Sequence, residues 1–467
     1  MSSSYPRCYT PLNADEFRIL VLEPGVRGAG LCCSLITQNL GDGVSYEALS
    51  YAWGDPTCTN RVRIGTQNFG VANNLYVALQ YLRYETRTRV LWIDAICIDQ
   101  ANLSERSQQV QLMNLVYRGA ECVLVWLGEQ NYNSDSAFDI LEKWAPLTRP
   151  SMYEFAHYFG TQFGISSNER HVNTLVETIN LTAISTLNVE IARAGKPRSV
   201  NFRETIRNGG FPDFDYIEAD ANDLICLLKT FHVNGERPWW GRRWVVQEVM
   251  NGRKLEIICG RRSIPWNRIT DFRNSVANLA TLNYPIQSIL STKIADSFRS
   301  VWNLDELRAR GRLFVGQNPT LSFEELLERF TRTRCSDPLD LIYSILNISN
   351  LPESSCPIDY SKSVVEVFSN ITRMIIAQSR NLFHLSSSSP SSTKELFQEQ
   401  WPTWMRDYSC LESPSILLKQ MDIRRGTLYS AAGNSVVSDS FYQEFRPRVL
   451  RLKGTLHDTI IAATKGM

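Results

Sequence analysis

The stretch from Arg89 to Gly128, RVLWIDAICIDQANLSERSQQVQLMNLVYRGAECVLVWLG, constrains the fold more than any other part of the 467-residue chain. It begins with a short run of apolar, β-branched and aromatic residues and ends with a second one, CVLVWL, as buried strands do. Between them, Ser104 before Glu105 is a typical helix start. Apolar side chains then recur every three or four positions, at Val110, Met113, Val116 and Tyr117. A strand–helix–strand unit of this kind predicts a right-handed parallel crossover.

Polar residues follow the first strand of this unit. Asp94 and Asp99 enclose the apolar segment Ala-Ile-Cys-Ile, and Gln100 comes next. Ligands of open parallel sheets bind beyond the carboxyl ends of the strands, so residues 94–100 are a candidate site. The structural alternatives are that Asp94 caps the following loop, and that Asp99 and Gln100 order the start of the helix.

Strands and one helix alternate before this unit, which is the pattern of an α/β layer. The predicted strands and helix lie at 17–22, 31–36, 46–53, 61–64, 69–71 and 73–84, the helix capped by an Asn. The first two strands are separated by Pro24-Gly25 and predict a hairpin or an edge ribbon. Tyr51 and Trp53 end the strand at 46–53, where their rings can either stack on a nicotinamide or adenine ring or pack in the core.

Downstream of residue 128 the pattern becomes mainly helical. Residues 130–235 predict a helical insertion with mobile loops near 164–170 and 193–212, and Pro238 is expected to begin a helix that reaches Met250. The remaining predicted elements are a last strand at 255–259, helices at 268–282, 321–331, 338–348 and 361–378, a linker at 386–392 and a strand at 449–454. We therefore expect one domain at 15–262 and a mainly α-helical region at 263–467.

Composition excludes several classes of function. The net charge of +1 gives no global field for binding nucleic acid. The 11 cysteines form no CxxC pair and the five histidines no ligand spacing, so neither a metal site nor a disulfide framework is expected. No apolar run approaches the roughly 18 residues of a membrane span. Cys97, between two Ile, predicts a buried, inert thiol. These patterns indicate a soluble, cytoplasmic protein that needs no cofactor.

Several ordered blocks carry a family resemblance. They are YEALSYAWGD at 46–55, LWIDAICIDQ at 91–100, QVQLM at 109–113, VWLG at 125–128 and RPWWGRRWVVQE at 237–248. Together they resemble the fungal heterokaryon incompatibility (HET) domain, and DPLDLIY at 337–343 and WPTW at 401–404 are similar to the usual tail of such proteins. Asp99 stands where the family usually has Asn, which adds a charge and removes an amide donor.

The resemblance implies a role in fungal non-self recognition, in which activation leads to cell death. The HET domain has been likened to the TIR domain, a flavodoxin-like α/β fold, and some TIR domains cleave NAD through a glutamate in a Trp-Cys-x-x-Glu pattern. Trp244 and Glu248 have that spacing, so the resemblance implies that Glu248 is catalytic and that NAD is the substrate. The structural alternative is that Glu248 forms an ion pair with Arg242 or Arg243.

We therefore expect a TIR/flavodoxin-like parallel sheet with a small N-terminal β-ribbon, a helical insertion and a mainly α C-terminal region. The first hypothesis for its function is an incompatibility effector that hydrolyses NAD, with Glu248 catalytic and a pocket lined by Tyr51, Trp53, Asp94, Asp99, Gln100, Arg243 and Trp244. The arginines near residue 240 could bind a pyrophosphate or pair with acids. The second hypothesis is a non-enzymatic death-signalling module that self-associates or binds an incompatibility partner.

Overall fold

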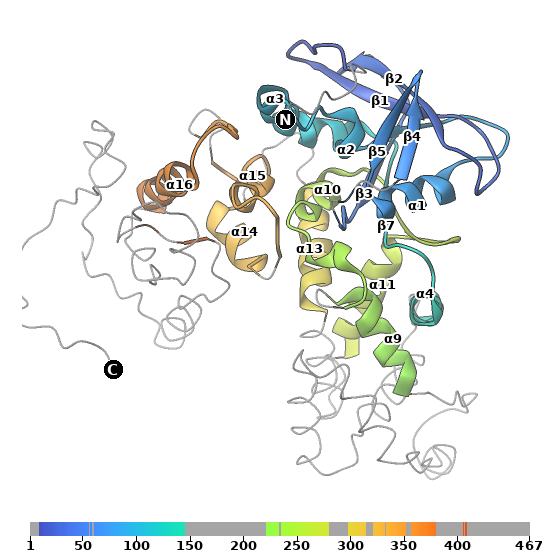
Figure 1. Cartoon of the computed structure of the whole chain (residues 1–467). Helices are drawn as coiled ribbons and strands as arrows, with labels where there is room; N and C mark the ends of the chain where they lie inside the picture. The colour runs from blue at the N-terminus through green and yellow to red at the C-terminus, as the bar shows by residue number, and fades with distance from the viewer. Residues whose placement is uncertain are drawn as a thin grey trace, which may run out of the picture. The chain divides into compact units, whose positions relative to one another are not determined.

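The computed structural model divides the chain into two compact units, each described in part (Figure 1). The described residues are 9–55, 57, 60–144, 221–232, 235–279, 298–313, 321–331, 333–351, 356–379, 405 and 407–408. The first unit contains Met1–Pro319 and Arg332–Arg334, and the second contains Thr320–Thr331 and Cys335–Met467. The domain boundary near residue 262 stays a prediction.

A mixed nine-stranded sheet forms the centre of the first unit, as far as its described residues show, with the order β5-β4-β2-β1-β6-β3-β7-β8-β9. The strands are β1 (Glu16–Leu22), β2 (Cys32–Asn39), β3 (Glu47–Tyr51), β4 (Asn60–Ile64), β5 (Gln67–Val71), β6 (Arg89–Trp92), β7 (Cys122–Trp126), β8 (Leu255–Cys259) and β9 (Arg262–Pro265). The prediction of a mixed α/β protein is confirmed, as are the hairpin of β1 with β2 and the ribbon of β4 with β5.

Four parallel strands, β6-β3-β7-β8, lie at the middle of the sheet. All of β7 and all of β3 after Glu47 are buried, because helices cover both faces. The strands at the two ends of the 89–128 unit are parallel, as predicted. However, they are not neighbours, because β3 lies between them and pairs with both.

The helices described in the first unit follow the alternating pattern. They are α1 (Asn73–Leu82), α2 (Asp94–Cys97), α3 (Leu103–Gly119), α4 (Tyr132–Trp144), α9 (Ala221–Phe231), the 3-10 helix η1 (Pro238–Gly241), α10 (Val245–Asn251), α11 (Asn267–Leu279) and α13 (Arg299–Leu313). The apolar positions predicted for the helix after Ser104 are all buried in α3. Helices α4 and α9 pack together at the two ends of the predicted insertion. The mobile loops predicted at 164–170 and 193–212 lie outside the described residues.

Helices α1 and α10 cover opposite faces of the sheet. Ser50 of β3 aligns with Val125 of β7, whereas the next residue, Trp126, points to the other face. The Ser50 side chain contacts Glu248 of α10, and the Trp126 indole contacts Asn74 of α1. Helix α3 packs against α10 and so shares its face (Figure 1).

Several predicted element ends are wrong. Helix α3 is capped by Asn102, whose side chain accepts the Glu105 amide, and not by Ser104. Asn102 has Glu105 three positions after it, which is the spacing of a capping box, whereas Ser104 has no such partner. Asn73 does not cap α1 but is its first residue. Pro238 begins the short turn η1, and α10 starts only at Val245, because Arg242 between them is extended.

Two elements of the first unit were not predicted from the sequence. The strand at 255–259 is not the last, since β9 follows it across Gly260, which has a φ of 58° and forms the tight turn. Helix α13 is the second, and it packs against α10 and α11.

The second unit contains three described helices, α14 (Phe323–Arg329), α15 (Asp340–Leu346) and α16 (Val364–Ser379). They confirm the helices predicted at 321–331, 338–348 and 361–378. The predicted linker at 386–392 and the predicted strand at 449–454 lie outside the described residues.

Candidate functional site

A buried ionic cluster lies at the carboxyl ends of β3 and β6. Asp94 is the second residue after β6. Glu248 of α10 contacts Ser50 near the end of β3. Arg242 Nη1 lies 3.6 Å from Glu248 Oε1. The side chain of Glu248 is 1% exposed and that of Arg242 18%, so the arginine forms the more open side of the cluster. Arg242 is one of the two partners named in the structural alternative for Glu248.

Ser50 connects Glu248 to the sheet. Its hydroxyl donates to Glu248 Oε2 and accepts from Trp239 Nε1 at 2.7 Å. All three side chains are buried, so each of these hydrogen bonds satisfies a polar group that water does not reach. This chain of contacts fixes the Glu248 carboxyl relative to β3.

Burial dominates the protonation of both carboxyls. It raises the pKa of Glu248 to about 7, against the opposing effects of Arg242 and of the Ser50 hydrogen bond, and repulsion from Asp94 adds to the rise. Burial likewise raises the pKa of Asp94, although Arg242 and two hydrogen bonds favour its charged form. Burial lowers the pKa of Arg242, but attraction to Glu248 and Asp94 outweighs the effect of burial, so the pKa of Arg242 is raised. The cluster therefore exchanges a proton near neutral pH.

The stability of the protein is expected to depend on this proton. The pKa of Glu248 is about 7 in the folded protein and near 4.5 in the unfolded chain. The bound proton therefore stabilises the folded state fully below pH 4.5, and this stabilisation is lost as the pH rises through about 7. Glu248→Gln removes this titration. As the pH rises from 4.5 to 8, wild type should lose up to about 3 kcal/mol of unfolding free energy that the variant does not lose. Urea titration of both proteins across this range measures the difference. Parallel pH profiles of the two proteins would contradict the assignment.

Asp94 is held by its neighbours on three sides. Its Oδ1 accepts the Ala95 amide at 2.7 Å, its Oδ2 accepts Trp53 Nε1 at 2.9 Å, and its backbone oxygen accepts Gln100 Nε2 at 2.9 Å. Asp94 is thus the first residue of α2 and binds the amide of the next residue, without being the N-cap, and it is also electrostatically coupled to Arg242. The Trp53 side chain is 43% exposed, so its ring is the most open part of the cluster.

The structure places the other candidate residues around this cluster in different ways. Tyr51 is buried at the end of β3 and couples electrostatically to Arg242. Trp244 caps α10 and is half-buried, and its carbonyl oxygen accepts the Glu248 amide, as the predicted four-residue spacing requires. The Arg243 guanidinium donates to Thr333 Oγ1 at 3.3 Å, and the Asp99 side chain accepts the amide two residues later in its own loop.

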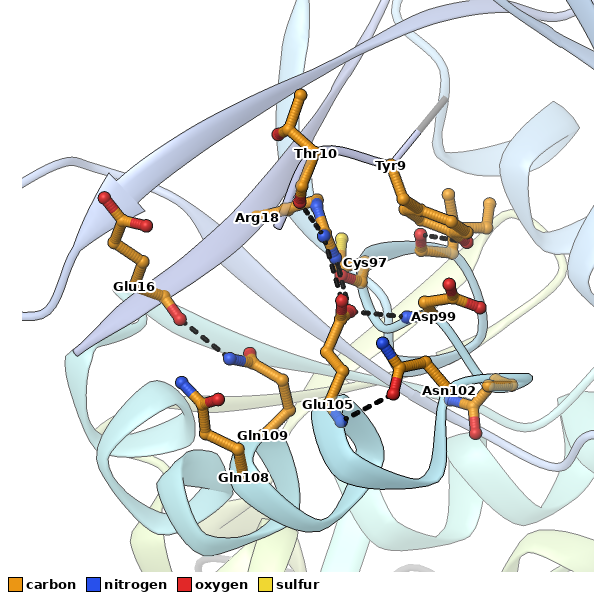
Figure 2. A network of polar contacts seen from close by, with 12 residues as sticks. Tyr9, Thr10, Glu16, Arg18, Cys97, Asp99, Asn102, Glu105, Gln108 and Gln109 are labelled. Atoms are coloured by element: carbon orange, nitrogen blue, oxygen red, sulfur yellow. Dashed lines mark hydrogen bonds and ion pairs between the residues drawn. The ribbon is translucent and has the colours of Figure 1, made fainter. Parts of the chain in front are cut away.

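A second buried ion pair holds the loop that follows Asp94 (Figure 2). Arg18 of β1 binds both carboxylate oxygens of Glu105, at 2.6 and 3.1 Å, and donates to the Cys97 carbonyl at 3.0 Å. Glu105 also accepts the Asp99 amide at 2.8 Å. The network therefore fixes α2 and the first turn of α3 against β1. Cys97 is fully buried and burial raises its pKa to about 12, as expected of an inert thiol.

Arg308 of α13 fixes the C-terminal end of α10, the helix that carries Glu248. Its guanidinium donates to the carbonyl oxygens of Val249, Gly252 and Arg253, which follow Glu248 at the end of α10. These carbonyls have no partner within the helix, so the arginine caps it. Helix α10 is thus fixed by Ser50 in its first turn and by Arg308 at its end.

Three groups of the cluster escaped the sequence reasoning as site residues. Ser50, Trp239 and Tyr117 all lie in apolar segments that predict core packing, which they also provide. The available signal was the hydroxyl of Ser50 inside a buried strand, since a buried hydroxyl requires a partner. Among the described residues no group of His, Cys, Asp and Glu could hold a metal ion, and none of the described helices is long and apolar enough to cross a membrane.

Comparisons with known proteins place this cluster inside a family match. Residues 46–248 match the family described as "Heterokaryon incompatibility protein (HET)". A curated relative from Neurospora crassa, "Heterokaryon incompatibility protein 6, OR allele", is 25% identical over 390 residues, which cover 78% of this chain and 52% of the relative. The chain thus spans about half the length of that relative. No solved structure matches the chain significantly. The match contains Ser50, Asp94, Arg242 and Glu248, whereas Arg18 and Arg308 lie outside it.

Proposed function

Because residues 46–248 match the heterokaryon incompatibility (HET) family, we propose that the chain is an effector of fungal non-self recognition that triggers cell death by hydrolysing NAD. The observation that carries the proposal is the Glu248 carboxyl, which is held by Ser50 beside Asp94 and Arg242 and whose pKa is raised to about 7. Buried carboxyls with shifted pKa values are concentrated at catalytic sites.

The strand order supports a flavodoxin-like sheet, as in the TIR analogy. In chain order the parallel strands are β3, β6, β7 and β8, and in space they stand as second, first, third and fourth. That is the beginning of the flavodoxin-like order, whose ligands bind at the carboxyl ends beside the first strand. Here this position is the end of β3, where Ser50 and Glu248 meet.

The proposed chemistry needs one carboxylate near the sugar. The C1′–N bond of NAD breaks, its electron pair leaves with nicotinamide, and the ribose gains oxocarbenium character. Ionised Glu248 stabilises that positive charge and accepts a proton from the attacking water. The products are nicotinamide, ADP-ribose and one proton. Nicotinamide leaves as a neutral molecule, so no general acid is required.

The test is NAD cleavage by the purified full chain over a range of protein concentrations. Glu248→Gln should lower the release of nicotinamide by about 100-fold or more, because the neutral amide can neither stabilise the cation nor take the proton. Wild-type kcat should rise with pH through about 7 as Glu248 ionises. Glu121→Gln, at an exposed acid before β7, is the matched control and should retain full activity. Full cleavage by the Glu248 variant would overturn the proposal.

The burial of the same cluster favours a second candidate function. Glu248 is 1% exposed, and the chain itself supplies partners for both carboxyls. A cluster of this kind also serves a non-enzymatic signalling module that self-associates or binds an incompatibility partner. Leu103 and Leu115 of α3 are exposed apolar side chains of the sort that interfaces use.

Cell killing separates the two candidates. If Glu248→Gln folds, as judged by circular dichroism, and still kills fungal cells, the signalling module is favoured. If killing and NAD loss disappear together, the hydrolase is favoured. Light scattering across concentrations then shows whether either activity requires assembly.

A further inference from the structure

Two polar atoms of the cluster have no hydrogen-bond partner among the described residues. They are the Tyr117 hydroxyl and Glu248 Oε1, which has only the ion pair with Arg242 at 3.6 Å. Tyr117 is fully buried and Glu248 is 1% exposed. The neighbouring carboxylate oxygen, Glu248 Oε2, is satisfied by Ser50. One donor and one acceptor of the cluster are thus left over, and the nearby Trp92 Nε1 and the Gln247 amide also lack a partner among the described residues.

The two residues belong to neighbouring helices of the first unit. Tyr117 lies on α3 and Glu248 on α10, and these helices pack together on one face of the sheet. The Tyr117 ring is fixed edge-on against Trp92 of β6, with centroids 5.2 Å apart. Its hydroxyl is electrostatically coupled to Glu248, Asp94, Arg242 and Tyr51, in that order. Its hydroxyl therefore lies close enough to the ionic cluster for its pKa to be raised by the charges there as well as by burial.

A buried hydroxyl without a partner is destabilising, and phenylalanine would fill the same position without that penalty. Tyr46 of the same domain shows the ordinary arrangement, because its buried hydroxyl donates to the Val116 carbonyl at 2.6 Å. Tyr117 thus retains a group that the fold itself does not use.

We propose that Tyr117 and Glu248 together bind one ribose hydroxyl of a nucleotide substrate, which donates to Glu248 Oε1 and accepts from the Tyr117 hydroxyl. A sugar hydroxyl is both donor and acceptor, so it satisfies both groups at once. This inference rests on the proposed function, and it adds a contact to one hydroxyl of the nicotinamide ribose. The ligand enters from the side of Arg242 and Trp53, the more exposed members of the cluster.

The test compares Tyr117→Phe with wild type on NAD and on NAD analogues that lack the 2′- or the 3′-hydroxyl of the nicotinamide ribose. With NAD, the variant should show a KM about tenfold higher and a nearly unchanged kcat, since the lost bond is present in the bound substrate and in the transition state alike. With the analogue that lacks the recognised hydroxyl, wild type and variant should have equal KM values. Tyr46→Phe is the matched control, with a lower unfolding midpoint and unchanged KM.

The outcomes separate the inference from the proposed function. If wild type cleaves NAD and Tyr117→Phe has an unchanged KM, the inference is wrong and the hydrolase stands. If wild type cleaves no NAD, calorimetric binding of NAD decides: weaker binding to Tyr117→Phe supports the ribose contact without catalysis. Equal binding, or none to either protein, overturns the inference.

Discussion

Replacing Arg18 with methionine is expected to lower the free energy of unfolding by about 3–5 kcal/mol, because it leaves the Glu105 carboxylate buried without its countercharge. Arg18 is 2% exposed and Glu105 8%, and two hydrogen bonds join them. The substitution also removes the donor to the Cys97 carbonyl, so the loop that follows Asp94 loses its attachment to β1.

Urea unfolding at neutral pH measures this loss. The double variant Arg18→Met with Glu105→Met should recover much of it, since two apolar groups leave no unpaired charge. Arg27→Met is the matched control: the Arg27–Glu129 pair is 44% and 60% exposed, and its loss should cost about 1 kcal/mol or less. Equal effects at Arg18 and Arg27 would show that the buried pair does not stabilise the fold.

Arg308→Met is expected to destabilise the first unit by about 3 kcal/mol or more. Its side chain is 3% exposed and donates to three carbonyl oxygens at and beyond the end of α10. Hydrogen bonds from a charged donor contribute about 1.5–3 kcal/mol each, and the carbonyls of Val249 and Gly252 would stay buried without this donor. Because α10 carries Glu248, we also expect the NAD cleavage of the folded variant to fall.

The next arginine on the same helix provides the control. Arg310 is 39% exposed and forms an ion pair with the half-exposed Glu306 one turn away, so Arg310→Met should change the unfolding free energy by about 0.5 kcal/mol. Thermal and urea unfolding of both variants test the difference. Arg308→Lys, which keeps the charge but has fewer donors in a different geometry, should fall between wild type and Arg308→Met.

Local patterns predict the strands of the sheet except β9, but not their order. The apolar runs at 89–92 and 122–126 are strands because both faces of each are covered, and that is visible in their residue types. The insertion of β3 between them depends on pairing with a segment more than 40 residues upstream, at Glu47 to Tyr51, and no local signal encodes such pairing. The predicted N-cap of α3 is wrong because Ser and Asn are both favoured at the N-cap position, and the sequence offers both Ser104 and Asn102.

The candidate site shows the same division. Asp94 and Glu248 stood out as acids beside apolar segments, and the structure couples them through Arg242. Their support could not be inferred, since Ser50 and Glu248 are 198 positions apart in the chain. Ser50 and Tyr117 look like parts of a core until the fold places a carboxylate beside them. Sequence patterns readily reveal charged groups, but they do not reveal which neutral side chains form hydrogen bonds with them in the fold.

The position of the family match within the sheet determines how the domain can be studied in pieces. Residues 46–248 end before β8 and begin after β1, yet β1 pairs with β6 and β8 pairs with β7. A fragment cut at those limits would expose the edges of β6 and β7, two apolar strands, which is the arrangement that leads to edge-to-edge aggregation. Homology boundaries and folding boundaries therefore differ in this chain, and recombinant fragments should include residues 9–313 at least.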